Sequence, residues 1–276
     1  FCLIASLLPA SDEADLLFRW DLRLWGGDLA LGWKAFRLLP GVDTILWASA
    51  GGGYQAMRYG ATAEDAVDPA AWDETQFTSI NGDWRLGLAQ GILYNQEQKR
   101  NLMELLLLYR GKYQYYIDEA GVLAGLPEAE GLFQNALFTG LLFDDTREDK
   151  KSLNKRGIYS VLSAEFVPAW FGNEIRGLSD FTRLSYICVG YLPVLESRAV
   201  SIYLGDRVLF DWLFGEEDRI PVSARTSFGA LTKVPIGSNP LHGLGGTLRG
   251  IPNDMFDGFI KLANNFDLRL HSPALT

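Results

Sequence analysis

The sequence predicts an all-β fold, an antiparallel transmembrane β-barrel, and three observations lead to this prediction. Apolar and polar residues alternate with period two over many segments of the 276-residue chain, which places one kind of side chain on each face of a strand. These segments exceed the roughly five or six residues of strands in soluble sheets, and they reach the about 9–11 residues of a strand that crosses a bilayer. No apolar run reaches the about 18 residues that a membrane-spanning helix needs. We therefore interpret residues 11–276 as one outer-membrane β-barrel domain.

The first ten residues differ from the rest of the chain. Residues 1–10 read FCLIASLLPA, a short apolar stretch that ends in a small residue and precedes the polar residues 11–13. This pattern is typical of the apolar region and cleavage site of a secretory signal peptide, so we interpret residues 1–10 as a signal-peptide remnant. A buried first strand is the alternative. Removal of Cys2 with this segment would leave Cys188 as the single cysteine, which excludes a disulfide within the mature chain.

Six segments alternate clearly, and their apolar members mark the face that would meet lipid. In chain order they are 16–24, 84–94, 103–117, 158–166, 184–194 and 260–270. Taken segment by segment, their apolar members include Phe18 and Trp20, Leu86 and Leu88, Leu105 and Leu107, Ile158 and Leu162, Leu184 and Tyr186, and Ile260 and Leu262. Four weaker candidates, 28–37, 43–57, 132–144 and 198–214, bring the expected number of strands to about ten.

The predicted connections alternate between short turns and long polar loops, as in outer-membrane barrels. The short ones are 39–43, 95–98 and 196–198, and the long ones are 59–82, 118–131, 145–156 and 215–256. Aromatic residues near the strand ends are expected to form girdles at the two membrane interfaces. They are Tyr54, Tyr59, Trp84, Tyr94, Tyr113, Tyr115 and Tyr116. A soluble β-sandwich or a lipid-binding barrel would alternate in the same way and is the alternative fold.

Composition and motifs exclude several classes of function. The net charge of −9 argues against nucleic acid as a partner, because phosphate contacts need clustered Lys and Arg. The sequence has no Cys-x-x-Cys, His-Glu-x-x-His or Gly-x-Ser-x-Gly motif, and His242 and His271 lack metal-ligand spacing. We therefore expect no metal, no cofactor and no catalytic residue. Paired loop acids such as Asp144-Asp145 leave an outer-membrane enzyme as a less favoured alternative.

A glycine-rich motif lies in the long connection 215–256. It reads GLGGTLRGI over 243–251, and the last predicted strand follows it. The residues that we assign to a motif loop in the barrel lumen are Gly245, Gly246, Leu248, Arg249 and Gly250. Glycines allow such a loop to fold tightly, and an arginine inside a barrel needs a carboxylate partner. By the phase of its strand Asp267 faces the lumen, so we expect it to pair with Arg249. An exposed loop arginine is the alternative.

The motif and the strand that follows it, with Asn264-Asn265-Phe266-Asp267-Leu268-Arg269, resemble the bacterial surface-antigen family of BamA/TamA-like outer-membrane assembly factors. Ile251 stands where the family has an aromatic residue, and Asp267 where it has Glu. We expect a fragment of such a protein, without the POTRA repeats that precede the family's barrel and incomplete at its C-terminal end.

The resemblance implies a function at the bacterial outer membrane. It implies that the chain assists insertion or translocation of other proteins there, with outer-membrane lipid and unfolded outer-membrane or secreted client proteins as partners. The motif loop would brace the lumen, while a weak strand seam would let a client strand pair at an open edge. A passive channel or a lipid-handling barrel, which kept the brace without the assembly role, is the alternative.

Overall fold

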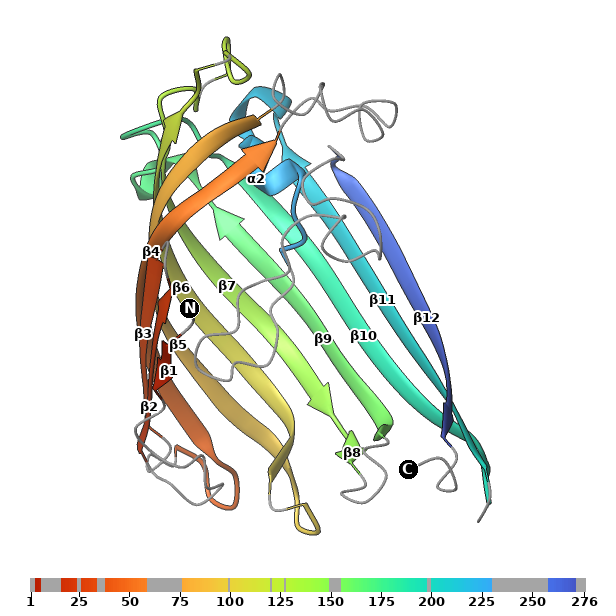
Figure 1. Cartoon of the computed structure of the whole chain (residues 1–276). Coiled ribbons are helices and arrows are strands. Elements are labelled where there is room, and N and C mark those ends of the chain that lie inside the picture. Colours follow the sequence, from red (N-terminus) through yellow and green to blue (C-terminus); the bar gives the residue numbers. More distant parts are fainter. Residues whose placement is uncertain are drawn as a thin grey trace.

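One curved antiparallel sheet makes up the fold of the chain. The computed structural model describes residues 3–5, 16–23, 26–33, 38–58, 76–98, 100–119, 121–126, 128–148, 155–197, 200–229 and 258–271. Over these residues the sheet has twelve strands, of which eleven follow one another in chain order, and the short β8 lies off this path, paired with β9. Figure 1 shows the long tilted strands arranged around an interior, with β12 and the first strands at the two edges of the sheet.

The strands and short helices have the following bounds. The strands are β1 (Leu3–Ala5), β2 (Leu16–Arg23), β3 (Gly26–Trp33), β4 (Thr44–Arg58), β5 (Gln76–Asn95), β6 (Arg100–Ile117), β7 (Leu132–Asp144), β8 (Arg147–Glu148), β9 (Lys155–Val167), β10 (Phe181–Glu196), β11 (Ser201–Gly215) and β12 (Ile260–His271). The helices are η1 (Ala169–Phe171), η2 (Glu217–Arg219) and α2 (Val222–Arg225). No helix in the described part of the chain is long and apolar enough to cross a membrane.

Every segment predicted to alternate forms a strand, and the antiparallel all-β class is confirmed. The structure adds β8 and β1, which pairs with β2 through Leu3 opposite Leu22. The pairing of β1 agrees with the alternative interpretation of the N-terminal segment as a strand, and its removal as a signal peptide stays a prediction. β5 begins at Gln76, inside the predicted connection 59–82. The strand extends there because Phe77 packs edge-on against Tyr116 of β6, with ring centroids 5.3 Å apart.

The two faces of the sheet differ in polarity. Over β5–β12, large apolar side chains on the convex face are exposed; they include Ile80, Leu86, Leu105, Leu107, Leu137, Leu141, Leu162, Phe166, Leu184, Leu192, Trp212, Ile260, Leu262, Phe266, Leu268 and Leu270. We call this set the convex band. The even-numbered apolar residues of 260–270 thus face outward as predicted, while Lys261 and Ala263 are buried on the other face. Tyr116 is a correction to the predicted girdle, because it is buried on the concave side against Leu123.

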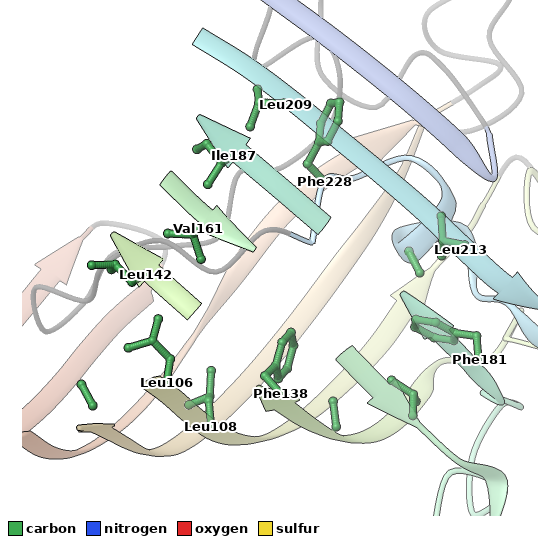
Figure 2. Close-up of a cluster of buried hydrophobic side chains, with 14 of the residues drawn as sticks. Leu106, Leu108, Phe138, Leu142, Val161, Phe181, Ile187, Leu209, Leu213 and Phe228 are labelled. Carbon is green, nitrogen blue, oxygen red and sulfur yellow. The ribbon is translucent and has the colours of Figure 1, made fainter. Parts of the chain in front are cut away.

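The concave face carries an apolar layer that crosses five strands. Leu142 of β7 pairs with Val161 of β9, which pairs with Ile187 of β10, and the row continues through Leu209 and Ala263. Each of these side chains is at most 3% exposed. Figure 2 shows Leu142, Val161, Ile187 and Leu209 lying along consecutive strands. The interior at this level is therefore built as a packed core.

The connections alternate between two ends of the sheet because neighbouring strands are antiparallel. What we call the loop end holds the described residues of the connections 118–131, 168–180 and 216–229, and the turn end holds 38–43, 96–98, 145–146 and 197. This corrects the grouping of 145–156 with the long loops, since it lies at the turn end, where β8 and β9 pair through Arg147 and Arg156. Within the described residues, β12 pairs only with β11 and β1 only with β2, so no pairing closes the sheet between them.

Candidate functional site on the concave face

The predicted motif loop cannot be located, because residues 243–251 lie outside the described residues. Its predicted partner Asp267 is half-buried on β12, opposite Gly205 of β11. The carboxylate of Asp267 lies 3.5 Å from the guanidinium of Arg269 on the same strand. Asp267 shares the face of buried Lys261, as its phase predicted. The Arg249–Asp267 pair therefore stays a prediction.

The first part of the same connection does enter the concave side. Residues 216–229, which we call the inner segment, include η2 and α2 and follow directly on β11. Pro221 fixes the start of α2, and the Val222 N–H donates to the Glu128 carboxylate at 2.6 Å. Val222 and Phe228 are 3% and 1% exposed, and Phe228 belongs to the cluster that includes Leu209 and Ile187. Figure 2 shows Phe228 beside these two side chains. Apolar side chains in the segment thus explain why it packs inward.

A row of buried charges faces the inner segment from five strands, the consecutive β9–β12 and β6. Glu165 of β9 is 2% exposed and lies between Arg110 of β6, at 2.6 Å, and Arg183 of β10, at 3.5 Å. Asp211 of β11 is fully buried and lies 3.8 Å from Arg183 and 3.4 Å from Lys261 of β12. We call these five residues the charge network. Strand register sets it, because Glu165 pairs with Arg183, and Asp211 with Lys261.

The charge network holds the backbone of the inner segment. Arg183 and Lys261 both donate to the carbonyl oxygen of Ala224, at 2.5 and 2.9 Å, and Lys261 also donates to that of Ser227. The Gly229 N–H donates to Asp211 at 2.8 Å. A side chain at Gly229 would place its Cβ 2.1 Å from the Arg183 guanidinium, so Arg183 would have to shift to admit it. These bonds satisfy backbone groups that the short helix leaves unpaired.

Contacts at Val222 and Ser223 link the inner segment to β6 and to the connection that follows β6. Lys112 of β6 lies 3.4 Å from the Ser223 hydroxyl, and Glu128, which caps α2, belongs to the connection between β6 and β7. The segment therefore joins β6 to β10, β11 and β12 across the concave side. Its contacts are ionic and apolar, and the described residues hold no cluster of three potential metal ligands. The arrangement fits a brace of the interior.

Sequence patterning placed three of the five members of the charge network on the polar face of predicted strands without assembling them. Arg110, Glu165 and Lys261 occupy polar positions of clearly alternating strands. Arg183 lies just before the predicted segment 184–194, and Asp211 lies in a weakly predicted strand. A sequence signal was present, namely charge at a position facing the lumen on adjacent strands, but the register that pairs the charges requires the structure.

Comparisons with known proteins show a similarity of fold alone. No family model matches the chain, and no curated protein matches it. Among solved structures the chain is similar to a crystal structure of BamA from Haemophilus ducreyi that lacks POTRA domains 1–3, with a TM-score of 0.45 and 9% sequence identity. The match covers 72% of this chain and 36% of that chain, so this chain spans well under half of its length. The strands and their register, rather than this similarity, define the fold.

Proposed function

We propose that the chain is an integral bacterial outer-membrane β-barrel that assists insertion or translocation of other proteins at that membrane. The convex band is the observation that supports membrane integration most directly. Exposed apolar patches larger than a few hundred Å² are rare on soluble monomers, whereas the convex band extends over β5–β12. On β12 it extends from Ile260 to Leu270, which is ~33 Å along the strand and ~25 Å across a bilayer at a tilt of ~40°. This height matches the apolar band of outer-membrane barrels.

The assisting role rests on the resemblance to the assembly-factor family, and the edge at β12 is the place that the described sheet offers to a client strand. In the described part of the chain β12 has a hydrogen-bonded neighbour on one side only. A strand edge with free backbone groups is a template for another strand, which adds by main-chain hydrogen bonds. An unfolded outer-membrane protein supplies such a strand. The inner segment would keep β10–β12 in place while a client strand pairs with the edge of β12.

One pair of matched variants tests membrane integration. Leu162 of the convex band is 55% exposed, and Leu39 in the turn between β3 and β4 is 50% exposed. For a barrel in lipid, Leu162→Arg costs ~2–4 kcal/mol near the bilayer midplane, and Leu39→Arg at the turn end costs about 0–1 kcal/mol. The measurement is unfolding by guanidinium in lipid vesicles. Equal, near-neutral effects, as expected for two exposed sites of a soluble protein, would contradict the proposal.

A photo-crosslinking residue tests the role of the edge. Placed at Phe266 on β12, it should form adducts with an outer-membrane protein during that protein's insertion. Placed at Leu141 on β7, which has neighbours on both sides, it should form none. Equal adducts at the two sites would contradict pairing at the edge.

A passive channel is the second candidate, and the charges on the concave face favour it. Charged side chains of both signs line the interior of channel-forming barrels, and here Glu165 and Arg183 lie on that face. The inner segment crosses this side, so conduction requires it to move. Steady ion conductance of the purified chain in a planar bilayer, together with no client adduct at Phe266, would favour the channel.

A further inference from the structure

The connection between β9 and β10 meets the inner segment just before β10, where the Asp180 N–H donates to the Arg219 carbonyl at 2.9 Å, and its earlier part lies on the other face of the sheet. We call residues 168–180 the outer loop. Its Phe171 packs edge-on against Tyr109, with ring centroids 5.9 Å apart, and its carbonyl accepts a hydrogen bond from the Asn135 side chain at 2.8 Å. Tyr109 has the phase of Leu105 and Leu107 in the convex band, and its hydroxyl donates to Asn135. The outer loop therefore covers part of the convex face near the loop end.

Asn173 fixes the outer loop to β7. It is fully buried, its side-chain oxygen accepts from the Asn135 N–H at 2.5 Å, and its amide donates to the Asn135 carbonyl at 2.9 Å. This one side chain takes the place of a neighbouring strand where β7 continues beyond the end of β9. The Phe133 N–H also donates to the Arg176 carbonyl at 2.8 Å. The loop is thus ordered by hydrogen bonds before it meets any partner.

Arg176 holds the other half of the outer loop. Its guanidinium lies over the rings of Tyr113 and Tyr115, at 5.6 and 5.3 Å, and donates to the Tyr113 hydroxyl at 2.6 Å. A second bond runs to the Glu130 carbonyl at 2.7 Å. Stacking on tyrosine and bonding within the protein keep this arginine on the convex surface.

Two large apolar side chains project from this fixed loop. Trp170 is 74% exposed and Ile175 is 76% exposed, the highest exposures among the large hydrophobic residues of the described chain. Their neighbour Glu174 is exposed as well. Exposing the apolar groups of a rigid loop to water is unfavourable, and burying them against an apolar or interfacial partner lowers the free energy.

We propose that the outer loop is an interfacial anchor, in which Trp170 and Ile175 insert into the headgroup region of membrane lipid at the loop end. The proposal rests on the proposed membrane integration of the barrel. Lipid is favoured over a protein partner because the outer loop continues the convex band, through Phe171 on Tyr109. Tryptophan favours the membrane–water interface because its ring is apolar and its N–H is polar.

Spin labels at three positions test the anchor. In the full chain with Cys2 and Cys188 replaced by alanine, the variants Ile175→Cys, Glu174→Cys and Leu162→Cys each carry one nitroxide. The barrel is reconstituted in vesicles of phosphatidylcholine and phosphatidylglycerol. Collisions with oxygen, which concentrates in hydrocarbon, are compared with collisions with a water-soluble nickel chelate.

We expect the label at 162 to collide mainly with oxygen and the label at 174 mainly with nickel. The label at 175 should collide with nickel several-fold less than the label at 174, although the two residues are adjacent. Adding Asn173→Ala should raise nickel collisions at 175, because the loop then loses its attachment to β7.

Three outcomes would overturn the anchor, and they are distinguishable. Nickel access at 175 equal to that at 174, with oxygen dominant at 162, overturns the anchor and leaves membrane integration intact. Nickel access at all three positions overturns membrane integration and the anchor with it. Low access of both reagents at 175, in detergent as well as in vesicles, indicates a protein contact in place of lipid and also overturns the anchor.

Discussion

Replacing Asp211 by asparagine removes one buried charge from the charge network while conserving volume. Its Oδ2 atom accepts from the Gly229 N–H at 2.8 Å and lies 3.4 Å from the Lys261 ammonium and 3.8 Å from the Arg183 guanidinium. All three groups lose a negative partner in Asp211→Asn. Because Asp211 and Lys261 are at most 2% exposed, water cannot replace the carboxylate without a rearrangement.

The size of the effect follows from what the two cations retain. Breaking a buried ion pair by removing one partner costs ~3–5 kcal/mol. Arg183 keeps Glu165 at 3.5 Å, and Lys261 keeps the carbonyls of the inner segment. These remaining partners place the expected loss of unfolding free energy at the lower end, ~3 kcal/mol.

An exposed ion pair provides the control. Glu196 lies 2.7 Å from Arg156, closer than Asp211 to Lys261, but its side chain is 41% exposed. Glu196→Gln should cost about 0–1 kcal/mol, because solvent screens the pair. Unfolding by guanidinium in vesicles measures both variants, and proteolysis within 216–229 reports release of the inner segment. A loss below ~1 kcal/mol for Asp211→Asn, or one no larger than that for Glu196→Gln, would refute the argument that burial decides the cost.

Three further predictions concern the interior. Phe228→Ala should lower the unfolding free energy by ~3–5 kcal/mol, since Phe228 is 1% exposed; a chemical denaturation midpoint unchanged from the parent would contradict this. Gly87→Ala should cost ~1–3 kcal/mol and shift the fluorescence of Trp47, because the added Cβ would lie 2.1 Å from the indole; an unchanged spectrum would show that the ring is placed differently. Arg249→Ala and Asp267→Asn should each lower the temperature at which the folded band converts to the unfolded band on a heat-modifiability gel. The loss in the double mutant should be smaller than the sum of the two single losses, whereas strict additivity would exclude the pair.

The strands could be predicted because their outer face is uniform. The predicted segment 132–144 coincides with β7, and 260–270 nearly coincides with β12. Lipid or water on one side and the core on the other require alternation at every second residue, and this signal is local in sequence. Tyr116 shows its limit, because an aromatic residue at a strand end suits an interface or a core equally. Only the packing of Phe77 and Leu123 around it decides.

The candidate site could be predicted only in its composition. Glu165 and Arg183 contact each other because β9 and β10 pair in one register, and a shift by one residue would turn both to the opposite face. The inner segment gave a weaker signal still, since its polar residues are typical of any exposed loop. Its buried state depends on bonds from Arg183 and Lys261 to the Ala224 carbonyl, which leave no pattern in the sequence of either partner.

The inner segment and the outer loop meet at the Asp180 N–H, which donates to the Arg219 carbonyl at 2.9 Å, and away from this contact they lie on different faces of the sheet. The polarity of what each meets explains the difference. Backbone carbonyls of the inner segment need donors, and the concave face supplies Arg183 and Lys261. The outer loop presents Trp170 and Ile175 beside the convex band, while Asn173 satisfies the backbone of β7 beneath it. Each loop therefore lies where its side chains and its backbone groups are satisfied together.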